Sequence, residues 1–161
     1  MSSPVVVNAS PLIFLSHAGL IDLLRMERES VFVPQPVIAE IRRRGHHDPT
    51  VVILATTPWL EEVKAVTPAS RVQAWRLGPG ETAVLSWALA NPGSTAIVDD
   101  RAARRCAEAL GIPLIGTLGL VLRAKRKGSL PAARPAVDRL LAAGLYLSER
   151  VLNQALSLVG E

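Results

Sequence analysis

The chain has 161 residues, of which about half are apolar and few are aromatic, and its formal net charge is +4. This length fits one domain with a sizeable core, and the excess of Ala, Leu and Val favours helices packed on a buried sheet over a sandwich or barrel. A lone cysteine, Cys106, excludes an internal disulfide and a cysteine-based zinc site, and it fits a reducing cytoplasm. No apolar run is long enough for a membrane span, and no basic residue precedes the first one, so we expect no signal peptide.

Apolar runs and turn residues divide the chain into alternating strands and helices. In chain order, the predicted strands cover residues 5–7, 31–33, 59–66, 96–98 and 112–115. The predicted helices cover residues 10–24, 37–44, 81–89, 102–110, 117–127, 134–143 and 148–158. Residues 45–70 are patterned less clearly: His46 to Pro49 look like a turn, and residues 59–66 are expected at a sheet edge. We expect Trp59, Trp75 and Trp87 in the core or in an interface.

The segment from Thr95 to Thr117 is the most informative part of the chain. An apolar run ends in two adjacent carboxylates, Asp99 and Asp100, a helical pattern follows, and a second apolar run ends at Gly116-Thr117. Strand–helix–strand units build parallel sheets, in which ligands bind beyond the carboxyl ends of the strands. The two aspartates fall at that edge, where carboxylates hold a divalent cation or repel another negative charge.

Several polar residues stand where an apolar element begins or ends: at the end of a strand, in the helix after a strand, or at the start of a helix. They are Asn8, Glu40, Glu81, Asp99 and Asp100. Because parallel strands end at one edge, these side chains can converge although they are distant in sequence. Several carboxylates brought together repel one another unless a cation compensates. Oxygen ligands suit Mg²⁺ or Mn²⁺ rather than zinc, and such ions support phosphodiester cleavage.

This ordered pattern resembles the PIN-domain family of metal-dependent ribonucleases. The resemblance is closest to the compact PIN-like proteins of bacteria and archaea that are grouped with VapC-type toxins. It covers nearly the whole chain except residues 45–70, and the strings that carry it are VVNASPLIFLSHAGLIDLL, VFVPQPVIAEI, LGPGETAVLSWAL, AIVDDRAARRCAEALGIPLIGTLGLVLRAKRKGSLP and LLAAGLYLSERVLNQAL. Each motif alone is weak, whereas the full set in family order is specific.

The resemblance implies a fold and an activity. The fold is a single three-layer α/β/α PIN-like domain over residues 1–161 with a central parallel sheet. The activity is Mg²⁺- or Mn²⁺-dependent endoribonuclease chemistry on RNA, carried out as the toxin of a toxin–antitoxin pair. The implied partners are a small antitoxin protein, whose basic side chain blocks the groove, and a second copy of the chain in a homodimer.

The resemblance also implies roles for individual residues. The family's four acid positions fall on Asn8, Glu40, Glu81 and Asp99, which are therefore the expected catalytic and metal-binding residues, with Asp100 as an additional or alternative metal ligand. The expected substrate-binding residues are Ser10, which matches a small hydroxyl residue near the first acid, Arg101, which follows the acid pair, and Thr117, in a turn that approaches the site.

Asn8 departs from the family pattern, because most active PIN nucleases carry aspartate there. An amide offers one neutral carbonyl ligand and no negative charge, so metal affinity should be weaker. This departure motivates an alternative function, in which the chain is a catalytically weakened PIN-like module that binds nucleic acid or regulates.

Each candidate residue also has a plain structural explanation. Glu40 could be a solvated helix residue, Glu81 could favour a helix N-terminus through the dipole, and Asp100 and Ser10 could be helix caps. A receiver-type phosphoacceptor domain is a further alternative for Asp99-Asp100, but the acid pair of receivers follows the first strand. The chain carries no nucleophile-elbow string and no Gly-rich phosphate loop.

Three basic clusters lie on helices next to the proposed acidic edge: Arg42 to Arg44, Arg101 with Arg104 and Arg105, and Arg123 with Lys125 to Lys127. Such clusters are commonly solvated helix faces. A cationic rim around an anionic pocket would also guide a phosphate backbone toward it. Aromatic residues are few, so we expect little sequence-specific stacking of single-stranded bases.

Overall fold

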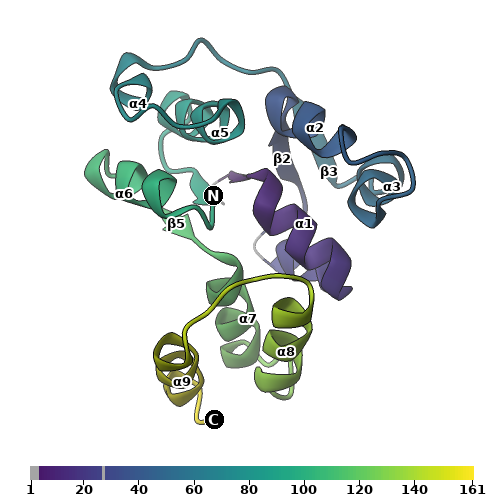
Figure 1. Ribbon diagram of the computed structural model, residues 1–161. Coiled ribbons are helices and arrows are strands. Elements are labelled where there is room, and N and C mark those ends of the chain that lie inside the picture. The colour runs from purple at the N-terminus through teal and green to yellow at the C-terminus, as the bar shows by residue number, and fades with distance from the viewer. Residues whose placement is uncertain (1–3, 27) are drawn as a thin grey trace.

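The computed structural model describes residues 4–26 and 28–161, and its centre is an all-parallel sheet (Figure 1). The strands are β1 (Val5–Val7), β2 (Val31–Pro34), β3 (Leu60–Val63), β4 (Thr95–Ile97) and β5 (Leu114–Ile115). Their order is β3-β2-β1-β4-β5, so the chain winds outward from β1 in one direction and then, from β4, in the other. The reversal leaves a crevice at the carboxyl ends of β1 and β4, where ligands of open parallel sheets bind.

Helices flank this sheet and complete the predicted three-layer α/β/α architecture. They are α1 (Ala9–Ala18), the 3₁₀-helix η1 (Ile21–Met26), α2 (Gln35–Arg42), α3 (Pro49–Thr56), α4 (Ser70–Gln73), α5 (Pro79–Ala90), α6 (Arg101–Ala109), α7 (Thr117–Arg126), α8 (Arg134–Ala142) and α9 (Glu149–Leu158). Helix α5 packs on β1, β2 and β4, and α1 packs on α2, α3, α7 and α8. Over residues 4–26 and 28–161, each helix is too short or too polar to traverse a bilayer.

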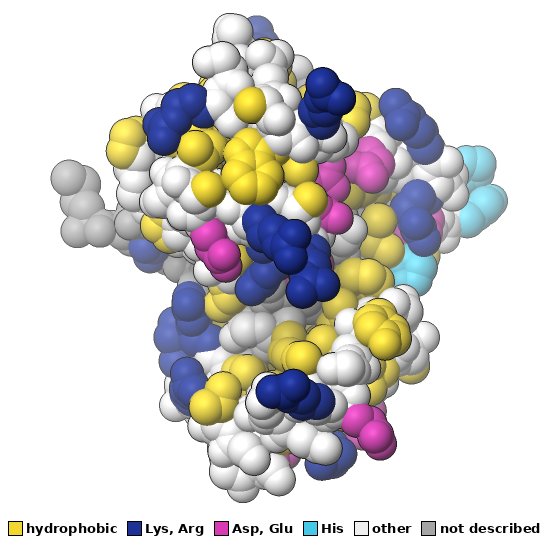
Figure 2. Space-filling view, turned by 60° about the vertical axis from the view of Figure 1, so that its left-hand side comes forward, with side chains coloured by type: hydrophobic (Ala, Val, Ile, Leu, Met, Phe, Trp, Pro, Cys, Tyr) yellow, Lys and Arg dark blue, Asp and Glu magenta, His cyan; other side chains and the backbone are white. Residues whose placement is uncertain are grey.

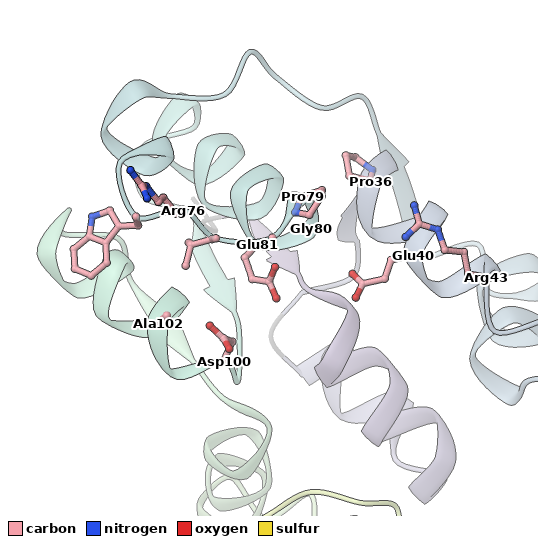
Figure 3. A pocket seen from close by; sticks show the side chains of 12 residues that line it. Pro36, Glu40, Arg43, Arg76, Pro79, Gly80, Glu81, Asp100 and Ala102 are labelled. Carbon is pink, nitrogen blue, oxygen red and sulfur yellow. The ribbon is translucent and has the colours of Figure 1, made fainter.

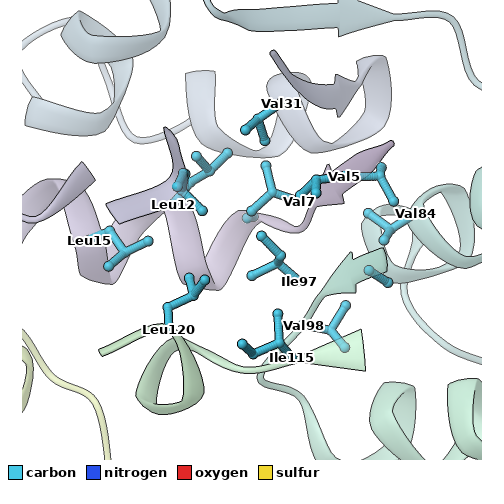
Figure 4. Close-up of a cluster of buried hydrophobic side chains, with 14 of the residues drawn as sticks. Val5, Val7, Leu12, Leu15, Val31, Val84, Ile97, Val98, Ile115 and Leu120 are labelled. Atoms are coloured by element: carbon cyan, nitrogen blue, oxygen red, sulfur yellow. The ribbon is translucent and has the colours of Figure 1, made fainter. Parts of the chain in front are cut away.

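The core lies on both faces of the sheet. All of β1 is buried, and Val31, Ile97 and Ile115 on neighbouring strands are buried with it. Leu12, Leu15, Val84 and Leu120 cover these strands from the helices (Figure 4). Burial on both faces explains why β1, at the centre of the sheet, is a continuous apolar run without alternation.

The register of β1 and β4 positions the polar residues that follow them. Val7 pairs with Ile97, and the backbone N–H of Asn8 donates to the Ile97 carbonyl at 3.0 Å. The two strands therefore end at the same level, and the residues after them, Asn8 and Asp99, emerge at the same edge.

Local signals account for three differences from the sequence prediction. The helix predicted over residues 10–24 is divided, because Gly19 takes a left-handed φ of 69° and ends α1 before η1 begins. Ser10 is not the cap residue: α1 begins at Ala9, and Asn8 occupies the cap position. The apolar stretch after Pro49 is the helix α3, capped by the Asp48 carboxylate, which accepts from the Thr50 N–H at 2.9 Å.

Candidate active site

A cavity of about 500 Å³ opens at the carboxyl edge of the sheet. Its walls come from α2, from the turn that leads into α5, and from the start of α6. Each wall contributes a carboxylate: Glu40 from α2, Glu81 from α5 and Asp100 from the residue before α6. In Figure 3 the Glu40 and Glu81 carboxylates point toward the same space from opposite walls.

Asn8 lies beneath these acids and is almost completely buried, with 1% of its surface exposed. It occupies the N-cap position of α1, yet its side chain makes no capping hydrogen bond. Instead its Nδ2 donates to Glu81 Oε1 over 3.4 Å. Its Oδ1 is buried and has no hydrogen-bond partner within the described part of the chain. A buried oxygen without a donor is unfavourable, and such groups mark positions that an ion, a water or a ligand completes.

Gly80 brings the oxygens of this cavity together. A Cβ atom at this position would lie 2.9 Å from Glu40 Oε2 and 3.2 Å from Asn8 Oδ1. Both oxygens therefore crowd around one backbone position, next to the Glu81 carboxylate that Asn8 contacts. The absence of a side chain at Gly80 is what allows two distant chain segments to place oxygen atoms there.

The electrostatics of Glu40 reflect this crowding. Burial raises the pKa of its carboxyl group above the ordinary value, and the negative charge of Glu81 raises that pKa further. The Arg43 guanidinium acts in the opposite direction but does not cancel the increase. Two carboxylates with insufficient compensation favour a bound cation.

The two adjacent acids after β4, Asp99 and Asp100, have different hydrogen-bond partners and line different cavities. Asp99 accepts two hydrogen bonds from Thr117, from its N–H at 2.8 Å and from its hydroxyl at 2.5 Å, and it lines a neighbouring cavity of about 460 Å³. Asp100 lines the first cavity, and its carboxylate also caps α6 by accepting from the Ala103 N–H at 2.9 Å. The plain structural explanation of Asp100 as a cap is therefore correct, although it does not exclude a second role.

The geometry fits a hard divalent cation only in part. An unpartnered amide oxygen, Asn8 Oδ1, lies with Glu40 and Glu81, and oxygen donors of this kind suit Mg²⁺ or Mn²⁺. No group of three His, Cys, Asp or Glu side chains suited to one metal ion occurs in residues 4–26 and 28–161. The arrangement thus offers two carboxylates and an amide, and water would supply the remaining ligands of a magnesium ion.

The residues expected to bind substrate lie around this edge in different environments. Ser10 is half-buried in the first turn of α1, Arg101 is exposed at the start of α6, and Thr117 is completely buried against Asp99. In the view of Figure 2, Lys and Arg side chains lie beside acidic side chains on the surface of the molecule.

Sequence reasoning missed several residues that line the cavity. Arg43 belongs to a basic cluster that was recognised, but Trp75 and Arg76 follow a short helix, α4, that the sequence did not indicate. Trp75 was expected in the core or an interface, and with 39% of its surface exposed it does not lie in the core. Gly80 belongs to the Gly78-Pro79-Gly80 string before the predicted helix over residues 81–89, and this string was the available signal for a close approach of side chains.

The site and the fold together define an α/β protein in which carboxylates and an amide lie at the switch point of an all-parallel sheet. The family model for DUF3368, described as a PIN domain, matches residues 4–161, so the chain belongs to the PIN-domain family. Members of this family are generally nucleases. A search of curated proteins finds no match to this chain.

Proposed function

We propose that the protein is a Mg²⁺- or Mn²⁺-dependent endoribonuclease and that residues 1–161 act as one PIN domain. Family membership supports the nuclease class. The observation that carries metal dependence is Asn8 Oδ1, a buried oxygen without a partner in the described structure, beside Glu40 and Glu81. The net positive charge of the chain supports a polyanionic substrate.

In this proposal the cation is held at the first cavity. Glu40 and Glu81 are its anionic ligands, and Asn8 contributes a neutral carbonyl. Asp100 faces the same cavity and is the additional ligand or the acceptor for a bound water. When bound, the divalent cation supplies an activated water and neutralises charge on the phosphodiester.

Asp99 is also proposed to act in catalysis and to bind the metal ion. It lies two residues beyond β4, the strand that pairs with β1 at the switch point, and its family position is that of the final acid. Its carboxylate is engaged by Thr117, so a ligand role requires a shared or rearranged interaction.

Positive and polar side chains around the cavity would hold the RNA backbone. Arg43 and Arg76 line the cavity wall, and Arg101 lies exposed next to Asp100. Guanidinium groups suit phosphate oxygens because they offer paired donors in one plane. Ser10 is proposed to contact substrate from α1, whereas Thr117 is buried and would contribute by positioning Asp99.

The biological setting is also a proposal. The resemblance supports a cytoplasmic toxin of a toxin–antitoxin pair that acts as a homodimer. The unbalanced carboxylates of Glu40 and Glu81 would attract a basic antitoxin side chain, which would exclude the cation. Cys106 is free and buried, which agrees with a reducing compartment.

A second candidate function is a PIN-like module that binds nucleic acid without cutting it. Two observations favour this alternative: an amide stands where most active PIN nucleases carry an acid, and Asp99 is hydrogen-bonded to Thr117 instead of facing the first cavity. Such a module would retain the cationic side chains around the cavity, and with them RNA binding, but would lack cleavage activity.

An assay of labelled RNA with and without Mn²⁺ separates the two functions. The nuclease proposal predicts Mn²⁺-stimulated cleavage that Glu81→Gln abolishes and that Glu108→Gln, an exposed acid on α6, leaves intact. Binding of RNA without cleavage at any Mn²⁺ concentration would select the binding module. Cleavage that survives in Glu81→Gln would remove the proposed metal site.

A further inference from the structure

Trp75 differs from the other tryptophans of the chain in its surroundings. Trp87 is 8% exposed and its ring packs against Phe32, with centroids 5.2 Å apart. Trp59 is half-buried, and the Arg25 guanidinium lies 5.5 Å from its ring centre. Trp75 is 39% exposed, and none of the ring contacts found over residues 4–26 and 28–161 involves it. Its indole lines the cavity that contains Glu40 and Glu81.

The backbone fixes Trp75 at the rim of that cavity. Its N–H donates to the Val72 carbonyl at 3.0 Å, and Val72 is completely buried. Arg76 follows with a φ of 53°, the only positive φ of a non-glycine residue within the described ranges. A left-handed conformation at an arginine is unfavourable, and such strain is maintained where the surroundings require a particular direction of the chain.

The turn that carries Trp75 is also tied to the helix that carries Glu81. The Ala69 N–H, at the start of α4, donates to Ser86 Oγ on α5 at 3.1 Å. Ser86 is buried, so this contact is protected from water. The indole therefore follows directly on α4, and this helix packs against α5, which carries the Glu81 carboxylate.

The cavity consequently combines three chemistries along its walls. Glu40 and Glu81 provide anionic oxygens, Arg43 and Arg76 provide guanidinium groups, and Trp75 provides a flat apolar surface at the opening. A ribonucleotide matches these features, because it has a phosphate for the cationic groups and a base for an aromatic surface. Single-stranded nucleic acids are commonly bound by stacking of bases on exposed aromatic side chains beside a basic groove.

We propose that Trp75 is a base-stacking platform that holds one nucleobase of single-stranded RNA beside the phosphodiester in the Glu40–Glu81 cavity. The proposal rests on the proposed function for the identity of the substrate. Stacking tolerates any base, so it orients the strand rather than selecting a sequence, with a modest preference for the larger purines. The proposal is therefore compatible with the expectation of little sequence-specific stacking.

The test measures the affinity of a short, end-labelled single-stranded RNA by fluorescence anisotropy, with a chelator present so that no strand is cut. Trp75→Ala is expected to weaken binding roughly ten-fold, the order typical of one stacked base. Trp75→Phe should retain most of the affinity, because it keeps an aromatic surface. Trp59→Phe is the matched control, and thermal unfolding of each variant verifies that it folds.

A set of oligonucleotides that each lack one base identifies a base contact. Removing the stacked base should weaken binding to the wild type as much as Trp75→Ala does, and Trp75→Ala should cause no further loss with that oligonucleotide. Unchanged affinity in Trp75→Ala overturns the stacking proposal. The proposal is also overturned if Trp75→Ala lowers the affinity equally for every base-lacking oligonucleotide, because the indole would then contribute to binding without contacting a base.

These outcomes are separate from the fate of the nuclease proposal. Loss of binding in Trp75→Ala together with no Mn²⁺-dependent cleavage by the wild type would retain the stacking platform and select the binding module. Cleavage that depends on Glu81, with no effect of Trp75→Ala on affinity, would retain the nuclease and remove the platform. A wild-type protein that neither binds RNA in the chelator nor cleaves it with Mn²⁺ would overturn both.

Discussion

The Asp99 carboxylate accepts two hydrogen bonds from Thr117, which joins the end of β4 to the first residue of α7. The N–H of Thr117 belongs to the first turn of α7, where backbone donors lack partners within the helix. Asp99 therefore performs for α7 the function that a capping side chain performs locally, but from a residue 18 positions away. Any catalytic role of Asp99 is combined with this structural one.

The first prediction concerns Asp99→Asn. In the proposed nuclease this variant abolishes Mn²⁺-stimulated RNA cleavage, and the weaker hydrogen bonds to Thr117 lower the free energy of unfolding by about 1 kcal/mol. Urea unfolding and the RNA assay measure the two effects separately. Asp138→Asn, an exposed acid on α8, is the control and should change neither. Full cleavage by a folded Asp99→Asn protein would leave Asp99 with the structural role alone.

The second prediction follows from the raised pKa of Glu40. Burial and the Glu81 charge raise that pKa above its ordinary value of 4.5, so the folded protein binds a proton at Glu40 more tightly than the unfolded chain does. The resulting stabilisation is complete below about that value and is lost as the pH rises through the raised pKa. Without metal, Glu40→Gln should therefore unfold at a higher temperature than the wild type at neutral pH, and the difference should shrink in acid.

Thermal unfolding at several pH values, with a chelator present, measures this effect. Glu108→Gln provides the control for removal of a carboxylate from an exposed site. Adding Mn²⁺ should reverse the order, since the wild type gains a bound ion and Glu40→Gln loses a ligand. A lower melting temperature for Glu40→Gln than for the wild type without metal would show that repulsion between Glu40 and Glu81 does not destabilise the metal-free protein.

The sheet and its order of elements could be predicted because its central strands are runs of mostly buried β-branched or aliphatic residues ended by a polar residue or turn. Val5–Val7 and the run before Asp99 are of this kind, and both faces of each are covered. Helix α3 was missed because residues 51–55 are apolar at every position, so they show no helical period. Several of them remain partly exposed, among them Val52 at 48%.

The site could be predicted only as a set of residues at one edge. Parallel pairing of Val7 with Ile97 brings Asn8 and Asp99 to the same edge of the sheet, and this follows from strand ends alone. The direction of each side chain does not follow from strand ends. Asp99 and Asp100 are adjacent, yet one contacts Thr117 and the other caps α6, because the backbone beyond the strand decides which neighbours each carboxylate meets. The exposed position of Trp75 likewise depends on a turn whose left-handed residue is an arginine.

The third prediction tests the departure at Asn8. Asn8→Asp replaces a neutral amide, which donates to Glu81, with a buried negative charge beside the Glu40 and Glu81 carboxylates. Without metal we expect a loss of roughly 2 kcal/mol in the free energy of unfolding, because the donor disappears and the charges repel. With Mn²⁺ the same variant should show a larger increase in melting temperature than the wild type and faster RNA cleavage. An Mn²⁺-induced shift smaller than that of the wild type would contradict a ligand role for this position.

The fourth prediction concerns Gly80, which the sequence presents only as part of a turn. A methyl group there would lie within 3.2 Å of both Glu40 Oε2 and Asn8 Oδ1. Glu40 is exposed on α2 and can move, whereas Asn8 is buried and held to Glu81, so the oxygens must separate. Gly80→Ala should therefore weaken Mn²⁺ binding, measured by the metal-induced shift in melting temperature, and Gly80→Val should weaken it further. Helix propensity alone predicts a different result, because Ala in the first turn of α5 would stabilise the metal-free protein by up to about 1 kcal/mol. Retention of the full Mn²⁺ shift in both variants would show that the oxygens around Gly80 do not hold the ion.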